Sequence, residues 1–154
     1  MDDKLKMDLD ELLGDLDLDL DGDFNLDFGD EFLNKVMVVD DDAGTLRNIK
    51  SLLDGAYKVV VANSGKKALE MLSAEKPDLI LLDYEMPLMN GPETMKMIRQ
   101  KPDFKDTPIV FLTGINDRTQ IAAALALRPA GYLLKPVDQS KLLMTILDAL
   151  NGGN

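Results

Sequence analysis

Short apolar runs separated by amphipathic stretches constrain the fold of this chain more than any other feature. Residues 36–39 (VMVV), 79–82 (LILL) and 109–112 (IVFL) do not alternate with polar residues, so as strands they would be buried on both faces. Residues 57–62 (YKVVVA) and 131–136 (GYLLKP) have the composition of two further strands. Strands buried on both faces are typical of parallel sheets covered by helices. The sequence therefore predicts a parallel sheet of five strands.

A helical pattern follows each predicted strand. After the first strand, Leu46, Ile49 and Leu53 form one apolar face and Gly55 is a stop signal. Strands that alternate with helices are joined by right-handed crossovers, which predicts an α/β sandwich. Four further helices are expected. The second runs from the candidate cap Ser64 to Pro77, and the third has Pro92 in its first turn. The fourth lies around Ile121 and Leu125, and the fifth covers residues 138–150.

Polar residues stand where the predicted strands end. Asp40 and Asp41 follow the first strand, Asp83 the third, Thr113 the fourth and Lys135 the fifth. The carboxyl ends of parallel strands share one edge of the sheet, where open α/β folds bind ligands. Three carboxylates there would repel one another, and a hard divalent cation would relieve the repulsion. With a hydroxyl and an ammonium beside them, they suit phosphoryl transfer to a carboxylate.

Each of these residues could also have an ordinary structural role. Asp42, the third acid of the run, is expected to cap the next helix rather than to bind a ligand. Thr113 alone could be a buried hydroxyl, and Lys135 alone a solvated lysine. Their coincidence at one edge of the sheet favours a site.

Composition excludes several kinds of chemistry. The chain has no cysteine and no histidine, which removes disulfides, thiolate or imidazole metal ligands and histidine acid/base catalysis. No apolar stretch is long enough to span a membrane, and the N-terminus is too acidic for a secretion signal. These features predict a cytoplasmic protein without a membrane partner.

The net charge of −11 lies in the first 33 residues, which contain 13 acidic residues and two lysines. From Asn34 onward, 15 acidic residues balance 15 basic ones. A neutral body with an acidic tail is a poor partner for nucleic acid. We therefore expect no DNA binding.

Within the tail, residues 16–28 (LDLDLDGDFNLDF) alternate apolar and acidic residues. The alternation is compatible with a hairpin, although a lone hairpin is marginal in water. The segment also resembles a calcium loop, but Phe28 stands where the bidentate Glu is required. The main expectation is that this segment is disordered. It would become ordered on binding a basic and apolar surface of a partner.

Four motifs in this sequence resemble those of the bacterial response-regulator receiver family in order and spacing. They are VMVVDDD (36–42), PDLILLDYEMPLMNG (77–91), IVFLTG (109–114) and GYLLKP (131–136). The resemblance implies a flavodoxin-like, doubly wound (βα)5 three-layer α/β sandwich with strand order 2-1-3-4-5. It divides the chain into an acidic N-terminal tail, residues 1–33, and a receiver domain, residues 34–154.

The resemblance also implies the residues that would hold a metal ion and accept a phosphoryl group. Asp83 would be the phospho-acceptor. Asp40 and Asp41 would position Mg²⁺ together with Asp83, with Mn²⁺ as the alternative ion. Glu85 would contribute its backbone carbonyl to the metal.

Further roles follow from the same resemblance. Thr113 would hydrogen-bond a phosphoryl oxygen, and Lys135 would bridge the phosphate and the acidic pair. Tyr132 would be the aromatic residue that turns inward when Thr113 moves. Gly114 would be the small residue next to Thr113. The Lys135–Pro136 peptide bond is expected to be cis.

These roles predict a stand-alone receiver of a two-component phosphorelay. A histidine kinase or phosphotransfer protein would phosphorylate Asp83 and switch contacts with a downstream protein, in a monomer or a phosphorylation-dependent dimer. The expected contact surface is the Ala-rich helix, the fifth strand and the last helix. The protein would not be an enzyme. The rival hypotheses are a phosphorylation-independent scaffold and an aspartyl-phosphate hydrolase of the haloacid dehalogenase type, with Glu85 as acid/base.

The last helix has two apolar stripes. Leu142, Ile146 and Leu150 form the first, and Leu143 and Leu147 form the second. The second stripe belongs either to a docking or dimerisation surface or to a contact beneath the Ala-rich helix, and the sequence leaves both open. Packing is the role expected for Met86, Met89, Met95 and Met97.

Overall fold

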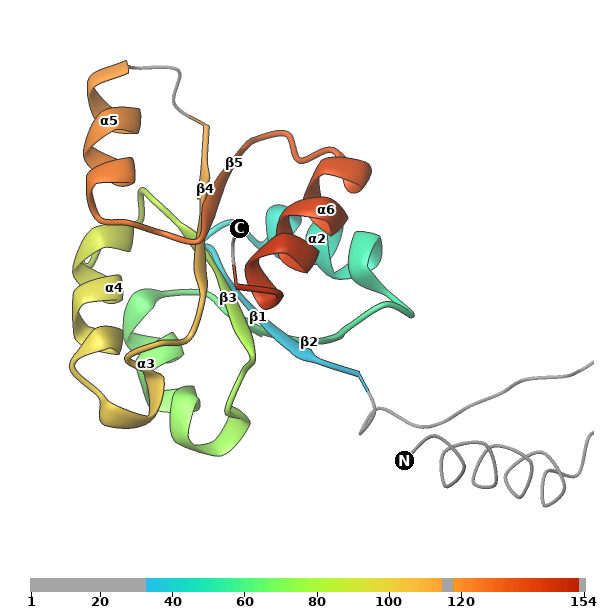
Figure 1. Ribbon diagram of the computed structural model, residues 1–154, viewed down its shortest axis with the longest axis horizontal. Helices are drawn as coiled ribbons and strands as arrows, with labels where there is room; N and C mark the ends of the chain where they lie inside the picture. The colour runs from blue at the N-terminus through green and yellow to red at the C-terminus, as the bar shows by residue number, and fades with distance from the viewer. Residues whose placement is uncertain (1–32, 115–117, 153–154) are drawn as a thin grey trace, which may run out of the picture.

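The computed structural model describes residues 33–114 and 118–152, and in them five strands form one parallel sheet (Figure 1). Neighbouring strands lie in the order β2-β1-β3-β4-β5 and every pair is parallel. The predicted α/β fold and strand order are therefore confirmed. The hypotheses about the tail concern residues outside the described ones. The strands are β1 (Lys35–Val39), β2 (Lys58–Ala62), β3 (Leu79–Asp83), β4 (Ile109–Thr113) and β5 (Gly131–Leu134).

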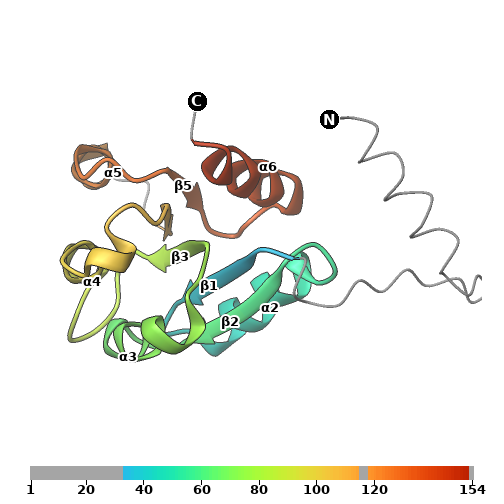
Figure 2. The same ribbon diagram turned by 60° about the horizontal axis from the view of Figure 1, so that its bottom comes forward.

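Helices cover both faces of the sheet. On one face lie α3 (Gly65–Glu75), α4 (Gly91–Arg99) and α5 (Arg118–Ala126), and on the other lie α2 (Ala43–Leu53) and α6 (Gln139–Leu150) (Figures 1 and 2). A short 3-10 helix, η2 (Pro102–Phe104), connects α4 to β4. Within the described residues, no helix combines the length and the apolar character needed to cross a membrane.

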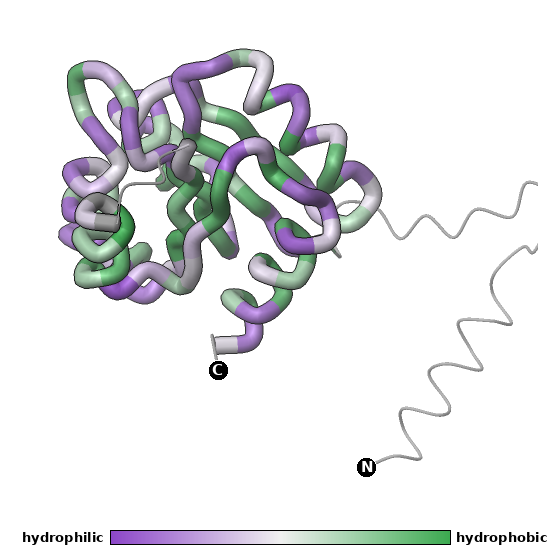
Figure 3. The backbone as a smooth tube through the Cα atoms, turned by 90° about the horizontal axis from the view of Figure 1, so that it is seen from above, coloured by the Kyte–Doolittle hydropathy of each residue, from purple (hydrophilic) through white to green (hydrophobic). Residues whose placement is uncertain are grey.

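The two helical layers define two apolar cores. Because successive side chains of a strand point to opposite faces, Val36 and Val38 of β1 pack toward α2 and α6, whereas Met37 and Val39 pack toward α3 and α4. β1, β3 and β4 have buried side chains on both faces, as their unbroken apolar runs predict. Figure 3 shows the hydrophobic stretches in the interior and the hydrophilic ones mainly in turns and on outer helix faces.

Side-chain caps set the starts of helices on the edge of the sheet where the strands end. The Asp42 carboxylate accepts a hydrogen bond from the Thr45 amide, and the Ser64 hydroxyl accepts one from the Lys67 amide. Both predicted caps are thus confirmed. Asn90 and Glu93 form a reciprocal capping box at the start of α4. Each of these three helices therefore begins at a residue whose side chain accepts a hydrogen bond from a free backbone amide of the first turn.

One expectation about apolar residues, and one of two alternatives left open by the sequence, are wrong. Met97 does not pack in the core, because 43% of its surface is exposed on the outer face of α4. Leu143 and Leu147 do not lie beneath α5, because α5 and α6 cover opposite faces of the sheet (Figure 1). Leu143 packs against the core beneath α2 and α6, whereas Leu147 is exposed.

Candidate functional site

Three carboxylates gather at the edge where β1 and β3 end. Asp40 follows β1, Asp41 comes next, and Asp83 is the last residue of β3. One carboxylate oxygen from each lies within 4.8 Å of the others. Asp40 and Asp83 are buried, and Asp41 is exposed. The cluster thus combines two desolvated acids with one that faces solvent.

Backbone hydrogen bonds that continue beyond the strands place these residues. The Asp40 amide donates to the Ala62 carbonyl at 3.1 Å, which extends the β1–β2 pairing by one residue. In the same way the Lys135 amide donates to the Thr113 carbonyl at 2.8 Å, so Lys135 stays in register just after β5. The parallel pairing itself therefore brings Lys135 to the carboxylate edge.

The Lys135 ammonium joins two of the carboxylates. Its Nζ lies 2.6 Å from Oδ2 of Asp40 and 3.3 Å from Oδ1 of Asp83. Partial burial alone would lower the pKa of Lys135, but its hydrogen bonds and charge interactions with Asp40 and Asp83 outweigh this and raise that pKa. The lysine is therefore a permanent cation in this site.

Asp83 has an unusual acidity. Burial, together with the negative charge of Asp40, raises the pKa of Asp83 from 3.8 to about 7, although Lys135 acts in the opposite direction. The Glu85 amide donates a weak hydrogen bond to Asp83 Oδ1 at 3.4 Å. Without a further positive charge, this carboxyl thus stays partly protonated at neutral pH.

A surface pocket of about 420 Å³ surrounds the cluster. Besides the three acids and Lys135, its lining includes Thr113, Gly114 and the exposed Glu85. Thr113 is buried as the last residue of β4. The sequence-predicted site residues therefore share one pocket, apart from Tyr132 and Pro136.

Tyr132 and Pro136 lie outside the lining of this pocket. Tyr132 is half-buried in β5, where it pairs with Phe111 of β4 and packs against the core on the α3–α5 side. The Lys135–Pro136 peptide bond is cis.

Gly91 is a positioning residue that the sequence reasoning did not single out. It begins α4, and its amide donates to the Tyr84 carbonyl at 2.9 Å. A Cβ atom on Gly91 would lie 2.5 Å from the Asp83 carbonyl oxygen and 2.8 Å from the Tyr84 Cα. Only glycine therefore lets α4 start directly against the strand end that carries Asp83. The available signal was a glycine just before a helix-starting proline.

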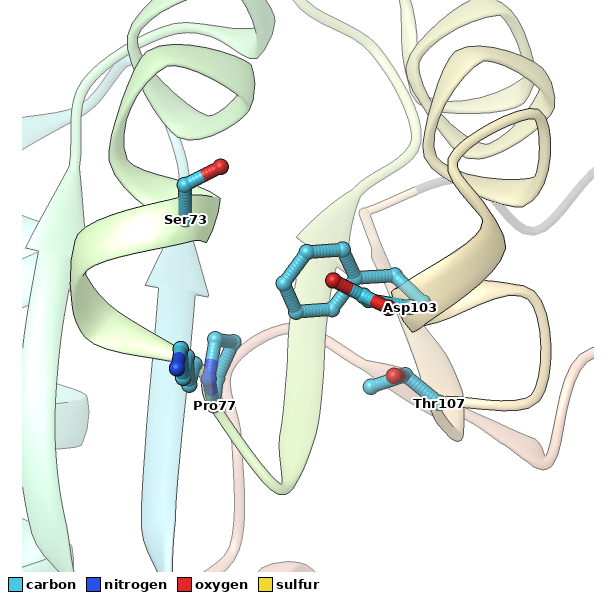
Figure 4. Close-up of a pocket in the computed structure, with 6 residues that line it drawn as sticks. Ser73, Pro77, Asp103 and Thr107 are labelled. Carbon is cyan, nitrogen blue, oxygen red and sulfur yellow. The ribbon is translucent and has the colours of Figure 1, made fainter.

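A second cavity, of about 480 Å³, lies between the end of α3 and η2 (Figure 4). Its lining includes Ser73, Pro77, Asp103 and Thr107. Across residues 33–114 and 118–152, Asp40, Asp41 and Asp83 form the one carboxylate group able to hold a metal ion. The second cavity is therefore a poor candidate for phosphoryl chemistry.

The donor set at the sheet edge fits a hard divalent cation. It consists of carboxylate oxygens, which Mg²⁺ and Mn²⁺ prefer, and the chain has no imidazole or thiolate to favour a softer metal. Burial, and after it the negative charge of Asp40, raise the pKa of Asp83, and a bound cation would favour its ionised form. Asp40, Asp41 and Asp83 are thus suited to hold such an ion.

Comparisons with known proteins agree with this geometry. The chain is 35% identical over 123 residues to the transcriptional regulatory protein YdfI of Bacillus subtilis, covering 78% of this chain and 56% of that protein. It is 36% identical over 115 residues to the transcriptional regulatory protein CpxR of Escherichia coli, covering 74% and 48%. The chain thus spans about half the length of these curated relatives.

Solved structures are similar over most of the described fold. The chemotaxis protein CheY4 of Vibrio cholerae matches with a TM-score of 0.71 at 31% identity, covering 76% of this chain and 98% of that one. A response regulator receiver domain protein from Clostridium thermocellum matches with a TM-score of 0.70 at 30% identity, covering 77% and 95%. Residues 36–147 match the family model of the response regulator receiver domain. The chain therefore belongs to the receiver-domain family of two-component response regulators.

Proposed function

We propose that this receiver is a phosphoacceptor in which Asp83 takes a phosphoryl group in a Mg²⁺-dependent reaction. The donor would be a histidine kinase or a phosphotransfer protein. One observation carries the proposal: Asp83 lies within reach of two further carboxylates and 3.3 Å from the Lys135 ammonium, in a pocket open to solvent. A nucleophilic carboxylate, metal ligands and a fixed cation are the parts that such a transfer requires.

In the transfer, a carboxylate oxygen of Asp83 forms a bond to the phosphorus atom of the donor. The bond between phosphorus and the donor nitrogen or oxygen breaks, and the donor keeps that electron pair. Asp83 must be ionised to attack, and its pKa of about 7 makes ionisation incomplete at neutral pH. Bound Mg²⁺ would supply positive charge that favours the ionised form and offsets charge on the phosphoryl oxygens.

Lys135 and Thr113 would respond to the new oxygens. The ammonium is already shared between Asp40 and Asp83, so additional negative charge on residue 83 would draw it away from Asp40. The backbone bond between Lys135 and the Thr113 carbonyl couples the ends of β4 and β5. Movement of Lys135 and Thr113 would be transmitted to Tyr132 in β5. It would shift the equilibrium between two conformations of the protein that present different contact surfaces.

We further propose a stand-alone receiver that acts in the cytoplasm through protein contacts, as a monomer or a phosphorylation-dependent dimer. The likeness on which this part of the proposal rests is the match to CheY4, whose chain is covered to 98%. Exposed Leu125, Leu134 and Leu147 on α5, β5 and α6 support contacts with a downstream protein. The balanced charge from Asn34 onward argues against a DNA partner. The protein would be a signalling switch rather than an enzyme that acts on a separate substrate.

Intact-mass spectrometry after incubation with acetyl phosphate and Mg²⁺ tests the proposal. We expect a gain of one phosphoryl group, which EDTA and Asp83→Asn abolish and which Asp54→Asn, at an exposed acid outside the pocket, leaves intact. A gain that survives in Asp83→Asn would refute the assignment of Asp83. No gain at all would favour the phosphorylation-independent scaffold.

A further inference from the structure

An apolar groove with cations along it lies between α4 and α5, away from the carboxylate pocket. Its volume is about 580 Å³, and its lining includes Leu127 and Met95, which is 6% exposed. Lys96 and Arg99 belong to the same lining, and Glu93 is the carboxylate among the lining residues that the structure describes. Leu127 is 43% exposed. The groove therefore suits a segment that carries both apolar and acidic side chains.

The cations of the groove are not neutralised by the body. Among residues 33–114 and 118–152, no ion pair joins Lys96 or Arg99 to a carboxylate. Arg99 uses one guanidinium nitrogen to donate to the Phe104 carbonyl at 3.1 Å. Burial lowers the pKa of Arg99, and the charge of Asp106 offsets only part of this effect. A carboxylate placed here would therefore meet positive charge that lacks a close partner.

We propose that the acidic tail of this chain, through residues 16–28, binds the groove between α4 and α5. The segment LDLDLDGDFNLDF alternates leucine or phenylalanine with aspartate. Side chains of an extended segment point alternately to opposite sides. The apolar row can therefore lie on Met95 and Leu127 while carboxylates stay near Lys96, Arg99 and the exposed Arg128.

Chain connectivity makes the tail the best-placed occupant. Residue 33 lies two positions before the start of β1, and α4 and α5 end at the edge of the sheet where the strands begin (Figure 1). The seventeen Cα–Cα steps from Leu16 to Leu33 span up to about 57 Å. The route crosses two strand spacings, roughly 10 Å in all, and one layer of roughly 10 Å. Tethering also keeps the tail at an effective concentration of about a millimolar, so even weak binding suffices.

Charge favours the tail over other occupants. The first 33 residues hold all of the net charge of −11, and the remainder is neutral. Another copy of the body would bring balanced charge to the groove, whereas the tail brings aspartates next to leucines. A foreign acidic peptide would have the same chemistry without the tether.

Paramagnetic broadening in solution tests this contact on the full chain. Since the sequence has no cysteine, Asn25→Cys provides a single site for a nitroxide label. We expect broadened amide signals from Lys96 to Arg99 and at Leu127 and Arg128. Raising the salt concentration to about 1 M, where the Debye length is about 3 Å, should weaken the effect.

Matched variants separate the groove from other surfaces. Lys96→Glu with Leu127→Asp changes two exposed side chains and should reduce the broadening several-fold. Lys141→Glu with Met144→Asp makes the same changes at exposed residues of α6, on the opposite face, and should leave it intact.

Three results would overturn the proposal. Broadening that is absent or centred on the β2 edge or α6 would place the tail elsewhere. Broadening unchanged by Lys96→Glu with Leu127→Asp would exclude the groove. Equal broadening in a mixture of spin-labelled and isotope-labelled chains would show a contact between two copies.

Discussion

Asp83→Asn is expected to stabilise the metal-free protein at pH values above about 3.8, where the wild-type carboxyl ionises in the unfolded chain. Asparagine has nearly the shape of the neutral carboxyl but carries no charge. The pKa of Asp83 is about 7 in the folded protein against an ordinary 3.8, so ionisation is harder in the folded state. The wild-type protein therefore has its full unfolding free energy below the unfolded-state pKa of 3.8 and loses part of it as the pH rises to the folded-state pKa of about 7. The advantage of the variant should grow over that interval and then level off.

The size of the effect follows from the same two pKa values. Each pH unit between 3.8 and about 7 costs the wild-type protein about 1.4 kcal/mol of unfolding free energy. The full interval amounts to about 4 kcal/mol. Water reaches the pocket beside exposed Asp41 and Glu85 and screens the repulsion. We therefore expect about half of this value, or about 2 kcal/mol, at the plateau.

Urea unfolding of both proteins with EDTA, from roughly pH 5 to pH 8.5, measures the difference. Asp54→Asn, which removes the charge of an exposed acid outside the pocket, is the control. A stability difference for Asp83→Asn that is flat with pH, or of opposite sign above pH 7, would refute the reasoning. Saturating Mg²⁺ should narrow or reverse the difference, because ligand binding stabilises the wild-type protein more.

Three further changes have defined expectations. Gly91→Ala places a Cβ 2.5 Å from the Asp83 carbonyl oxygen and should lower the unfolding free energy by roughly 1–3 kcal/mol. Gly44→Ala in α2, where the nearest atom is 3.5 Å away, is the control and should be neutral or stabilise the protein by up to about 1 kcal/mol. Equal effects of the two substitutions in urea unfolding would contradict the packing argument. Lys135→Ala leaves Asp40 buried without its cation and should cost roughly 2–4 kcal/mol in metal-free protein, while calorimetry should show that Mg²⁺ binding persists; loss of that binding would make the lysine part of the metal site. Deleting residues 1–33 should leave the cooperative thermal transition and the phosphorylation of Asp83 in place, as checked by calorimetry and intact mass. Loss of the transition would show that the tail is part of the folded core.

The placement of the site was predictable because it depends on strand ends, and unbroken apolar runs mark these ends directly. Asp40, Asp83, Thr113 and Lys135 needed only the parallel topology to come together. The unusual pKa of Asp83 was not predictable in magnitude, since it depends on how completely neighbouring groups exclude water. Met97 was placed wrongly because it was assigned by residue type, whereas it lies off the stripe of buried positions of α4, which are Gly91, Thr94, Met95 and Ile98. Gly91 was missed because its role is a contact between backbones, which leaves no hydrophobic pattern.

The carboxylate pocket is formed by residues from a central strand and from an edge strand of the sheet. β3, which carries Asp83, is buried along its whole length and pairs with a strand on each side. Among the strands that the structure describes, β5, which precedes Lys135, pairs with β4 alone, and it is partly exposed. Amide hydrogens of β3 should therefore exchange with solvent only through global unfolding, and those of β5 through smaller openings. Substitutions that loosen the β5 edge would change how readily the protein switches conformation while Asp83 stays in place. Natural selection can therefore adjust the sensitivity of the switch without altering the phosphoryl-transfer residues.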